Sequence, residues 1–524
     1  MKKNPNGEPI PEPQIISGET TNDKTERILN ILATTLRCSV LAIGAAYILV
    51  YLWMALAKRM PYPFELEWFE DQSVIHVQRI LRGLPLYVPP SLNFIPTVYT
   101  PLYYYVSALS AQLMPLGYSP LRLVSLLSSI GLALLIFRIV RTRTGGSWFW
   151  GFLAASFMIA SFRVTGAWLD VARVDSLFLF LALAAIMAFS SRIPLLNSGL
   201  APALMFLAFF TKQSGLVVSL PLAAWSLYHR RGPSRFLFSG IFFGAVLLST
   251  FVMNRLSDGW YSFHVFTVAS GHGIDSIIPV HFWSNDMFMH AGIACVFTAV
   301  YFLHGLRHRN QKEWSLDAAI LIGMVLVSYL SRLHVGGYTN CLLPAYAALA
   351  IYSALGMSLL AEKGGREADL VKSGIHVAVL IQLLALFYWP GDQIPTPAAE
   401  AQGKRVITIL KLLEGDVFMP NHPWYPAMAG KATFANTVTI TDVQRSTNVP
   451  DSLKITLQNS ILGAIAERRF TAIVLDGNGE FPSGAPQLED NYTLVNNKLS
   501  DETFNPLTGE ATSPRLLYMV KSTR

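Results

Sequence analysis

About eleven long apolar runs constrain this chain more than any other feature of its sequence. Most are long enough for the roughly 17 to 25 residues of a membrane-spanning helix. They are residues 36–57, 120–140, 147–165, 175–191, 197–211, 213–229, 236–254, 288–305, 315–331, 341–361 and 373–390. The composition, 52% hydrophobic and only 14% charged, exceeds the need of a water-soluble core. The sequence therefore predicts an all-α polytopic membrane protein with about 11 transmembrane helices.

The basic residues indicate how these helices are oriented. They form short clusters between the apolar runs: Arg138–Arg143, Arg192, Arg230–Arg235, Arg307–Lys312 and Lys363–Lys372. These clusters share the side of the N-terminal tail if the tyrosine-rich segment 98–116 does not cross, as the positive-inside rule requires. We therefore expect that segment to lie flat at the membrane interface. The protein is then expected to lie in the plasma (inner) membrane, with its N-terminus in the cytoplasm.

Three regions follow from this topology. Residues 1–34 are polar and predict a disordered cytoplasmic tail, residues 35–390 form the transmembrane domain with a first outer loop at 58–119, and residues 391–524 form a small soluble extracytoplasmic α/β domain. In the last region we expect helices at 401–413 and 451–467 and strands at Asp416–Met419 and Thr471–Leu475. The net charge of +7 is scattered as topology signals, so nucleic acid is not an expected partner. The three cysteines have no metal-binding or disulfide spacing.

Four carboxylates gather in the first outer loop, directly after a predicted span. They are Glu65, Glu67, Glu70 and Asp71. A helix from Glu65 to Arg82 would place Glu67, Glu70 and Asp71 on one face and turn Trp68, Val74 and Ile75 toward lipid. Converging charges beside a membrane indicate a functional site. The alternative is an acidic helix start, stabilised by the helix dipole.

Further polar residues lie on the same predicted outer side. One predicted span begins with Asp170, Arg173 and Asp175, for which a simple salt bridge is the alternative to a functional role. Lys212 interrupts an apolar stretch, and the alternative there is that its side chain snorkels to the membrane interface. The segment Ser331–Asn340 carries Arg332, His334 and Asn340, which suit a phosphate or sugar but also fit a glycine-rich turn. His272 and His422 are weaker candidates, as solvated or packing residues.

The order of these motifs resembles the GT-C superfamily of polyprenyl-phosphate-sugar-dependent glycosyltransferases, particularly the protein-mannosyltransferase-like glycosyltransferase family 39. The resemblance rests on the acidic first loop, Gly83–Tyr87, Tyr99–Tyr103, Ala172–Ser176 and Thr211–Ser214, in that order. The family's Asp-Glu pair is missing from the first loop, where Glu65-Leu-Glu67 and Glu70-Asp71 stand instead.

The resemblance implies a lipid-phosphate-linked sugar donor and an outer-loop carboxylate as general base. Glu67 is favoured as the base, with Glu65, Glu70 and Asp71 as alternatives, and Asp175 orients the acceptor or base. Donor and substrate contacts are assigned to Lys58, Arg59, Tyr103, Asp170, Arg173, Lys212, His272, Arg332, His334 and Asn340. The acceptor is a glycan, a lipid or a protein. No cofactor is certain, and a divalent cation, Mg²⁺ or Mn²⁺, stays open because relatives differ.

Two rival functions remain at this stage. A secondary transporter would place ionisable residues near the middle of the bilayer, whereas here they lie at one edge of the spans. Another membrane transferase, such as an acyltransferase or a glycan ligase, would share the edge-located site. It should show a clearer nucleophile or catalytic histidine than His272 or His334.

Overall fold

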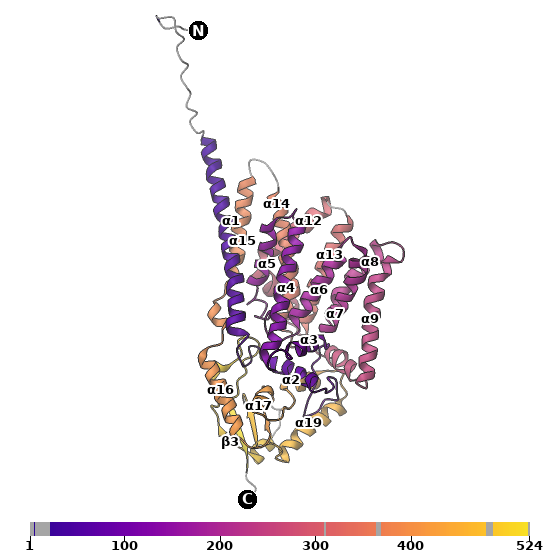
Figure 1. The fold of residues 1–524 in the computed structure, drawn as a ribbon, viewed down its shortest axis with the longest axis vertical. Coiled ribbons are helices and arrows are strands. Elements are labelled where there is room, and N and C mark those ends of the chain that lie inside the picture. Colours follow the sequence, from indigo (N-terminus) through magenta and orange to yellow (C-terminus); the bar gives the residue numbers. More distant parts are fainter. Residues whose placement is uncertain (1–4, 6–20, 309–310, 363–367, 478–485, 522–524) are drawn as a thin grey trace.

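The computed structural model describes residues 5, 21–308, 311–362, 368–477 and 486–521. A bundle of long helices forms one end of the molecule and a region with a small sheet forms the other (Figure 1). Most of the expected N-terminal tail lies outside the described residues. Helix α1 (Thr21–Met54) already begins within that tail. The reason is local, because residues 21–34 contain neither glycine nor proline.

The bundle is built from helices of two lengths. Among the described residues, six helices are long and apolar enough to cross a membrane, and one bent pair passes the same test when taken together. Four apolar helices are shorter. The bundle helices are α1, α4 (Tyr118–Arg143), α5 (Trp148–Ala160), α6 (Asp175–Phe189), α7 (Ala201–Thr211), α8 (Gly215–His229), α9 (Ser234–Leu256), α12 (His290–His308), α13 (Gln311–Leu333), α14 (Leu343–Ala361) and α15 (Ala368–Ala385).

Helix α14 is surrounded by protein. It packs against α4, α5, α12 and α13, and 94% of its apolar window is buried. Its sequence between Leu343 and Ala361 is rich in alanine, serine and glycine, and such small residues let neighbouring backbones approach closely. A central helix of this kind fixes the spacing of the others.

The first outer loop differs from the prediction. Helix α2 (Glu70–Leu81) begins five residues later than expected, and Val74 and Ile75 are buried instead of facing lipid. The cause is Glu70, whose carboxylate accepts the amide of Leu66 (2.7 Å) and holds the preceding residues outside the helix. Helix α3 (Leu102–Ser110) has nine residues, whereas a span needs about 20.

The C-terminal region combines helices with a four-stranded sheet of order β1-β2-β4-β3. Strands β1 (Val417–Phe418) and β2 (Ala472–Leu475) are parallel, while β4 (Leu516–Val520) pairs antiparallel with β2 and with β3 (Tyr492–Asn496). The expected two helices and two strands are present near their predicted positions. The helices are α16 (Pro397–Leu412), α17 (Trp424–Met428), α18 (Thr437–Arg445), α19 (Asp451–Ala466) and α20 (Pro486–Asn491).

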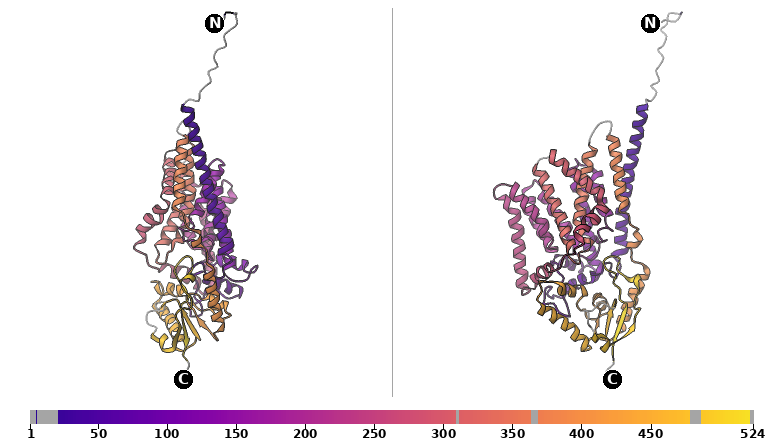
Figure 2. Two further views of the ribbon diagram at one scale, coloured as in Figure 1. Left: turned by 90° about the vertical axis from the view of Figure 1, so that its left-hand side faces the viewer. Right: turned by 180° about the vertical axis from the view of Figure 1, so that it is seen from behind.

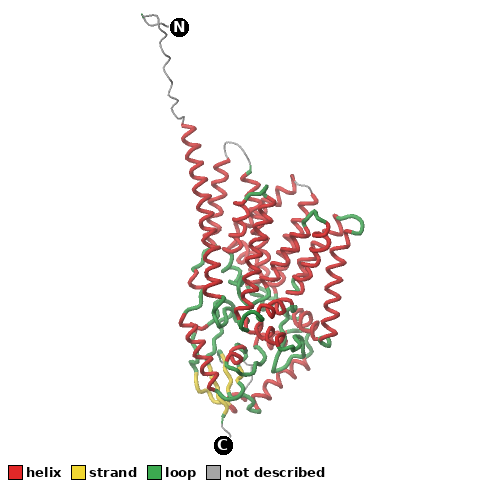
Figure 3. The backbone as a smooth tube through the Cα atoms, in the orientation of Figure 1, coloured by secondary structure: helices red, strands yellow, loops and turns green. Residues whose placement is uncertain are grey.

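This region packs on the outer loops of the bundle. Its core includes Phe418, Phe434 and Phe470 together with Leu92 and Ile95 of the first outer loop. Figure 2 shows the strands at the end of the molecule farthest from the start of α1. The loops, green in Figure 3, gather between the helical bundle and the sheet.

The first prediction concerns the orientation of the bundle. In a variant without Cys38, Cys295 and Cys341, a cysteine at Ser234 should react from the cytoplasmic side and one at Gly273 from the outer side, because the basic clusters share the side of Ser234. An impermeant maleimide on intact cells measures both. A cysteine at Thr456, an exposed residue of α19, is the matched test for the C-terminal region, and its protection from outside would contradict the orientation.

Candidate functional site

A cavity of about 780 Å³ lies where the bundle, the outer loops and the C-terminal region meet. Its lining combines aromatic rings with charged groups from all three parts of the chain. Of the predicted site residues it includes Glu67, Arg173, Lys212, His272, His334 and Asn340. The cavity has the size and mixed lining of a ligand site, and it is the candidate functional site.

Of the carboxylates predicted for the site, Glu67 lines this cavity. It is fully buried, and neither of its oxygens has a hydrogen-bond partner within the described structure. Arg173 Nη1 lies 3.6 Å from Oε2, close enough to attract it. Burial raises the pKa of Glu67 to about 8; Arg173 lowers it in part, and nearby Glu70 and Glu65 raise it again. A carboxyl group with this pKa gains and loses its proton close to neutral pH, as a general acid or base does.

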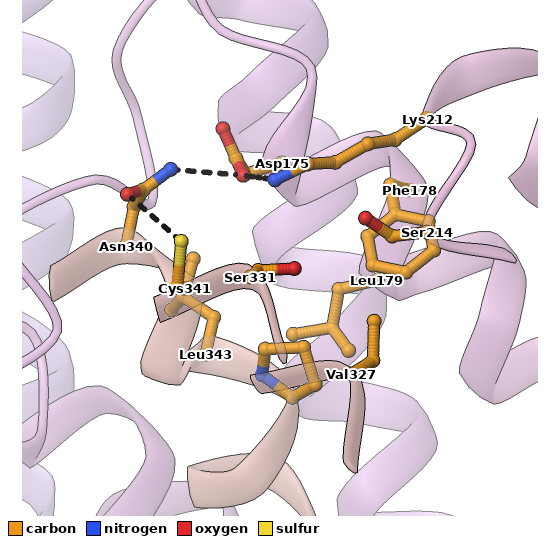
Figure 4. Close-up of a pocket in the computed structure, with 11 residues that line it drawn as sticks. Asp175, Phe178, Leu179, Lys212, Ser214, Val327, Ser331, Asn340, Cys341 and Leu343 are labelled. Carbon is orange, nitrogen blue, oxygen red and sulfur yellow. Dashed lines mark hydrogen bonds and ion pairs between the residues drawn. The ribbon is translucent and has the colours of Figure 1, made fainter. Parts of the chain in front are cut away.

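Asp175, Lys212 and Asn340 form a second cluster at the edge of the cavity. Lys212 Nζ donates to Asp175 Oδ1 (2.7 Å), and Asn340 Nδ2 donates to the same oxygen (3.1 Å). Figure 4 shows these three side chains turned toward one another, with Cys341 beside Asn340. Helix α7 ends at Thr211, which places Lys212 in the break before α8, and Asp175 is the first residue of α6, where the helix dipole favours an anion.

Glu70 has a structural partner that sequence reasoning missed. Arg122 of α4 is fully buried and binds both Glu70 oxygens, at 2.9 and 2.5 Å. Glu70 Oε1 also accepts the amide of Ala172 (2.6 Å). Burial opposes ionisation of Glu70, but Arg122 and the amides outweigh it and lower its pKa. The pair therefore joins the first outer loop, α4 and the segment around Ala172 that precedes α6.

The C-terminal region grips the segment that carries Glu67. Thr508 donates its amide to Leu66 O (3.1 Å), next to a parallel bridge between Glu67 and Thr508. Gly509 lies against the Trp68 ring with φ +90°, where a Cβ would overlap the ring. On the other side of Glu67, His422 Nδ1 lies 2.5 Å from Glu65 Oε2. The C-terminal region thus contacts the residues on both sides of Glu67 and sets its position.

Glu65 and Asp71 belong to this interface and are absent from the described cavity lining. His422 lies between Glu65 and Asp476, whose Oδ2 is 3.2 Å from Nε2. Burial disfavours the imidazolium, but Asp476 and Glu65 raise the pKa of His422 well above its usual value. Burial and then Glu65 raise the pKa of Asp71. These groups hold the loop to the C-terminal region.

The remaining predicted residues lie around the cavity in other roles. Arg59 is buried and binds Asp170 at 2.7 Å, while the exposed Lys58 lies over the Trp53 ring. Tyr103 donates its hydroxyl to Leu121 O (2.9 Å). Arg332 binds Asp286 Oδ2 (3.1 Å) and Gly337 O (2.6 Å). None of these predicted residues is among the described residues that line the cavity.

Comparison of the sequence with models of protein families and with curated proteins returns no match. Solved structures do match. ArnT from Cupriavidus metallidurans bound to undecaprenyl phosphate aligns with a TM-score of 0.57 and 13% identity, over 91% of this chain and 97% of ArnT. The apo state of the same protein aligns with a TM-score of 0.56 over the same shares. ArnT is a GT-C glycosyltransferase.

This chain has the GT-C fold. The predicted resemblance to GT-C proteins is therefore confirmed at the level of the fold. In this GT-C structure, no group of three or more His, Cys, Asp or Glu residues among those described is arranged to hold a metal ion.

Of the features of the site that the sequence analysis missed, one had a signal in the sequence and one had none. Arg122 lies inside an apolar run, and a charged residue in a span indicates function or a buried partner. Asp442 and Arg445, which line the cavity from α18, had no distinctive neighbours in the sequence. They join the site of the GT-C fold only through the packing of the C-terminal region.

The second prediction concerns the Arg122–Glu70 pair. Arg122→Met leaves a buried carboxylate without its partner, which should destabilise the protein by about 3–5 kcal/mol. Thermal unfolding in detergent measures this, and Arg122→Met with Glu70→Gln should recover part of the loss. The control is Arg138→Met, an exposed arginine of the same helix. Equal melting temperatures for Arg122→Met and Arg138→Met would show that the pair contributes little.

Proposed function

We propose that this multi-pass membrane protein is a glycosyltransferase that transfers a sugar from a polyprenyl-phosphate-linked donor to an acceptor hydroxyl on the outer face of the membrane. The observation that carries the proposal is Glu67, a buried carboxylate without a hydrogen bond that faces a cavity of about 780 Å³ beside two cations. The GT-C fold supports it, since one structure with that fold, ArnT, is bound to undecaprenyl phosphate.

The reaction assigns one step to Glu67. The acceptor oxygen attacks the anomeric carbon of the donor while Glu67 takes the hydroxyl proton. The bond between that carbon and the phosphate oxygen breaks, and its electron pair leaves with the polyprenyl phosphate. No oxidant or further reactant is needed. Arg173, 3.6 Å from Glu67, attracts the ionised form of Glu67, which is the form that takes the proton.

The leaving phosphate needs positive charge close to the bilayer edge. Lys212 and Arg173 both line the cavity, and both lie near the face of Tyr99. A preorganised cation stabilises charge that develops on a phosphate without waiting for solvent to reorganise. Asp175 Oδ1 accepts from both Lys212 Nζ and Asn340 Nδ2, and Asp175 thereby fixes the ammonium in place.

The same proposal includes the topology. The six long helices, four shorter apolar helices and one bent pair correspond in position to the eleven runs of the sequence. A cytoplasmic N-terminus and an extracytoplasmic C-terminal domain at 391–524 follow from the distribution of basic residues. The charged groups of the cavity then lie at one edge of the bundle, whereas a secondary transporter would hold them near its middle.

The third prediction tests Glu67. Glu67→Gln should reduce transfer by about 10²–10⁴-fold, the usual contribution of a general base. Because the pKa of Glu67 is raised to about 8, wild-type transfer should rise with pH through about 8, and the variant should lose this rise. A donor-saturated assay with the purified protein measures both quantities.

Two controls accompany this test. Glu414→Gln, at an exposed carboxylate of the C-terminal region, should transfer like the wild type. A raised pKa also means that the stability contributed by neutral Glu67 is present below its ordinary pKa of 4.5 and is lost as pH rises through about 8. Thermal unfolding should show this loss in the wild type and not in Glu67→Gln. Wild-type transfer by Glu67→Gln would show that Glu67 is not the general base.

The fourth prediction tests Lys212. Lys212→Ala should weaken binding of undecaprenyl phosphate about tenfold or more, because a charge-assisted contact to the phosphate is lost. Lys58→Ala is the matched control, since Lys58 is an exposed lysine outside the described cavity lining. Titration of the purified protein with undecaprenyl phosphate measures the affinities. Equal affinities for the two variants would return Lys212 to a purely structural pairing with Asp175.

A further inference from the structure

The cavity is lined by two parts of the chain. Lys212, Val217 and Leu330 line it from the bundle, and α18 lines it from the C-terminal region. A polyprenyl-linked donor keeps its chain in the bilayer, so it must occupy the bundle side. The side at α18 is therefore left for the second substrate, the one that supplies the hydroxyl.

Helix α18 presents one continuous face to the cavity. Thr437, Val438, Thr441, Asp442 and Arg445 all line it, with the spacing that places residues on a single side of a helix. Neither threonine hydroxyl among these has a hydrogen bond within the described structure, and Thr441 is exposed to the cavity. Two free hydroxyls at i and i+4 are ready to bind hydroxyl groups of a ligand.

The charge of the cavity lining around α18 favours one kind of acceptor over another. Arg445 is neutralised by its ion pair with Asp442 and also contacts His272 Nδ1 at 3.3 Å. Burial and then Arg445 lower the pKa of His272 to about 4, which leaves the imidazole neutral. The exposed Glu510 adds a negative charge to the same cavity. A phosphate group here would meet repulsion, whereas neutral hydroxyls would not.

Aromatic rings complete the lining next to α18. Trp68, Trp168 and Tyr338 line the cavity, and the rings of Trp168 and Tyr338 lie 5.2 Å apart. Trp68 and Tyr338 are half-buried, so part of each remains accessible. Apolar faces beside a few placed polar groups are typical of a ligand site. A sugar ring, with hydroxyls at its edge and C–H groups on its faces, matches both features.

We propose that the face of α18 defined by Thr437, Thr441 and Asp442 is the acceptor subsite, and that it takes an uncharged polyhydroxylated ring, the sugar of a glycan, in preference to a phosphate-bearing acceptor. This inference rests on the proposed function, because it assigns the second substrate of the same cavity. It gives the C-terminal region a direct part in substrate selection.

The fifth prediction tests this subsite by binding alone. Purified full-length protein, loaded with undecaprenyl phosphate on the bundle side of the cavity, is applied to an array of neutral oligosaccharides and their phosphorylated counterparts. It should bind neutral members in preference. Thr437→Val with Thr441→Val keeps the shape of the face and removes two hydroxyls. Titration with the best neutral oligosaccharide should therefore show that the affinity falls about tenfold or more.

The matched control is Thr456→Val, on an exposed face of α19, whose hydroxyl bonds only to Ser452 O of its own helix (2.8 Å). It should bind like the wild type. Preference for phosphorylated glycans, wild-type affinity in the double valine variant, or no binding to any neutral oligosaccharide would each overturn the inference.

The same experiment separates this inference from the proposed function. Glu67→Gln should still bind the neutral oligosaccharide, because Glu67 acts on the reacting hydroxyl and not on the rest of the ring. If the wild type transfers no sugar from any polyprenyl-phosphate donor while the valine variant still loses glycan binding, the proposed function fails and the subsite stands. If transfer occurs and the valine substitutions leave both affinity and transfer unchanged, the subsite fails and the function stands.

Discussion

The buried ion pair between Arg122 and Glu70 is the interaction on which the rest of the site depends. Arg122 also donates to the carbonyl oxygens of Arg59 (3.0 Å), Tyr62 (2.6 Å) and Phe64 (2.6 Å). A buried pair repays the cost of desolvation only when further hydrogen bonds satisfy both partners. Further hydrogen bonds satisfy the guanidinium here, because it binds backbone carbonyls and the carboxylate within the segment from Arg59 to Glu70. The carboxylate of Glu67 is held in place by these contacts.

The carboxylates of the outer loops divide into two kinds. Glu65, Glu70 and Asp175 each have a close cationic or imidazole partner; they connect one segment of the chain to another. Glu67 lacks hydrogen bonds and faces the cavity. A buried carboxyl group without hydrogen bonds costs folding free energy, so a fold that retains one must stabilise its surroundings by other means. The paired carboxylates supply that stabilisation around Glu67.

The sequence predicted the positions of the bundle helices well and the side-chain partners poorly, for physical reasons. An apolar run marks a membrane helix by itself, because the bilayer requires about 20 such residues. A partner is set by packing between distant segments: Arg122 is 52 residues from Glu70, and His422 is 357 residues from Glu65. The helix expected from Glu65 was wrong because a side-chain acceptor at Glu70 outweighed local spacing. Asp442 and Arg445 could not be found for the same reason as His422.

The C-terminal region contacts both the loop that carries Glu67 and the cavity. It holds the Glu67 segment through Thr508, and its helix α18 lines the cavity. It is also bound to the loop at Gly271, whose carbonyl oxygen accepts from Thr447 N (2.9 Å). A change in the packing of this one region would therefore alter both the surroundings of Glu67 and the face of α18.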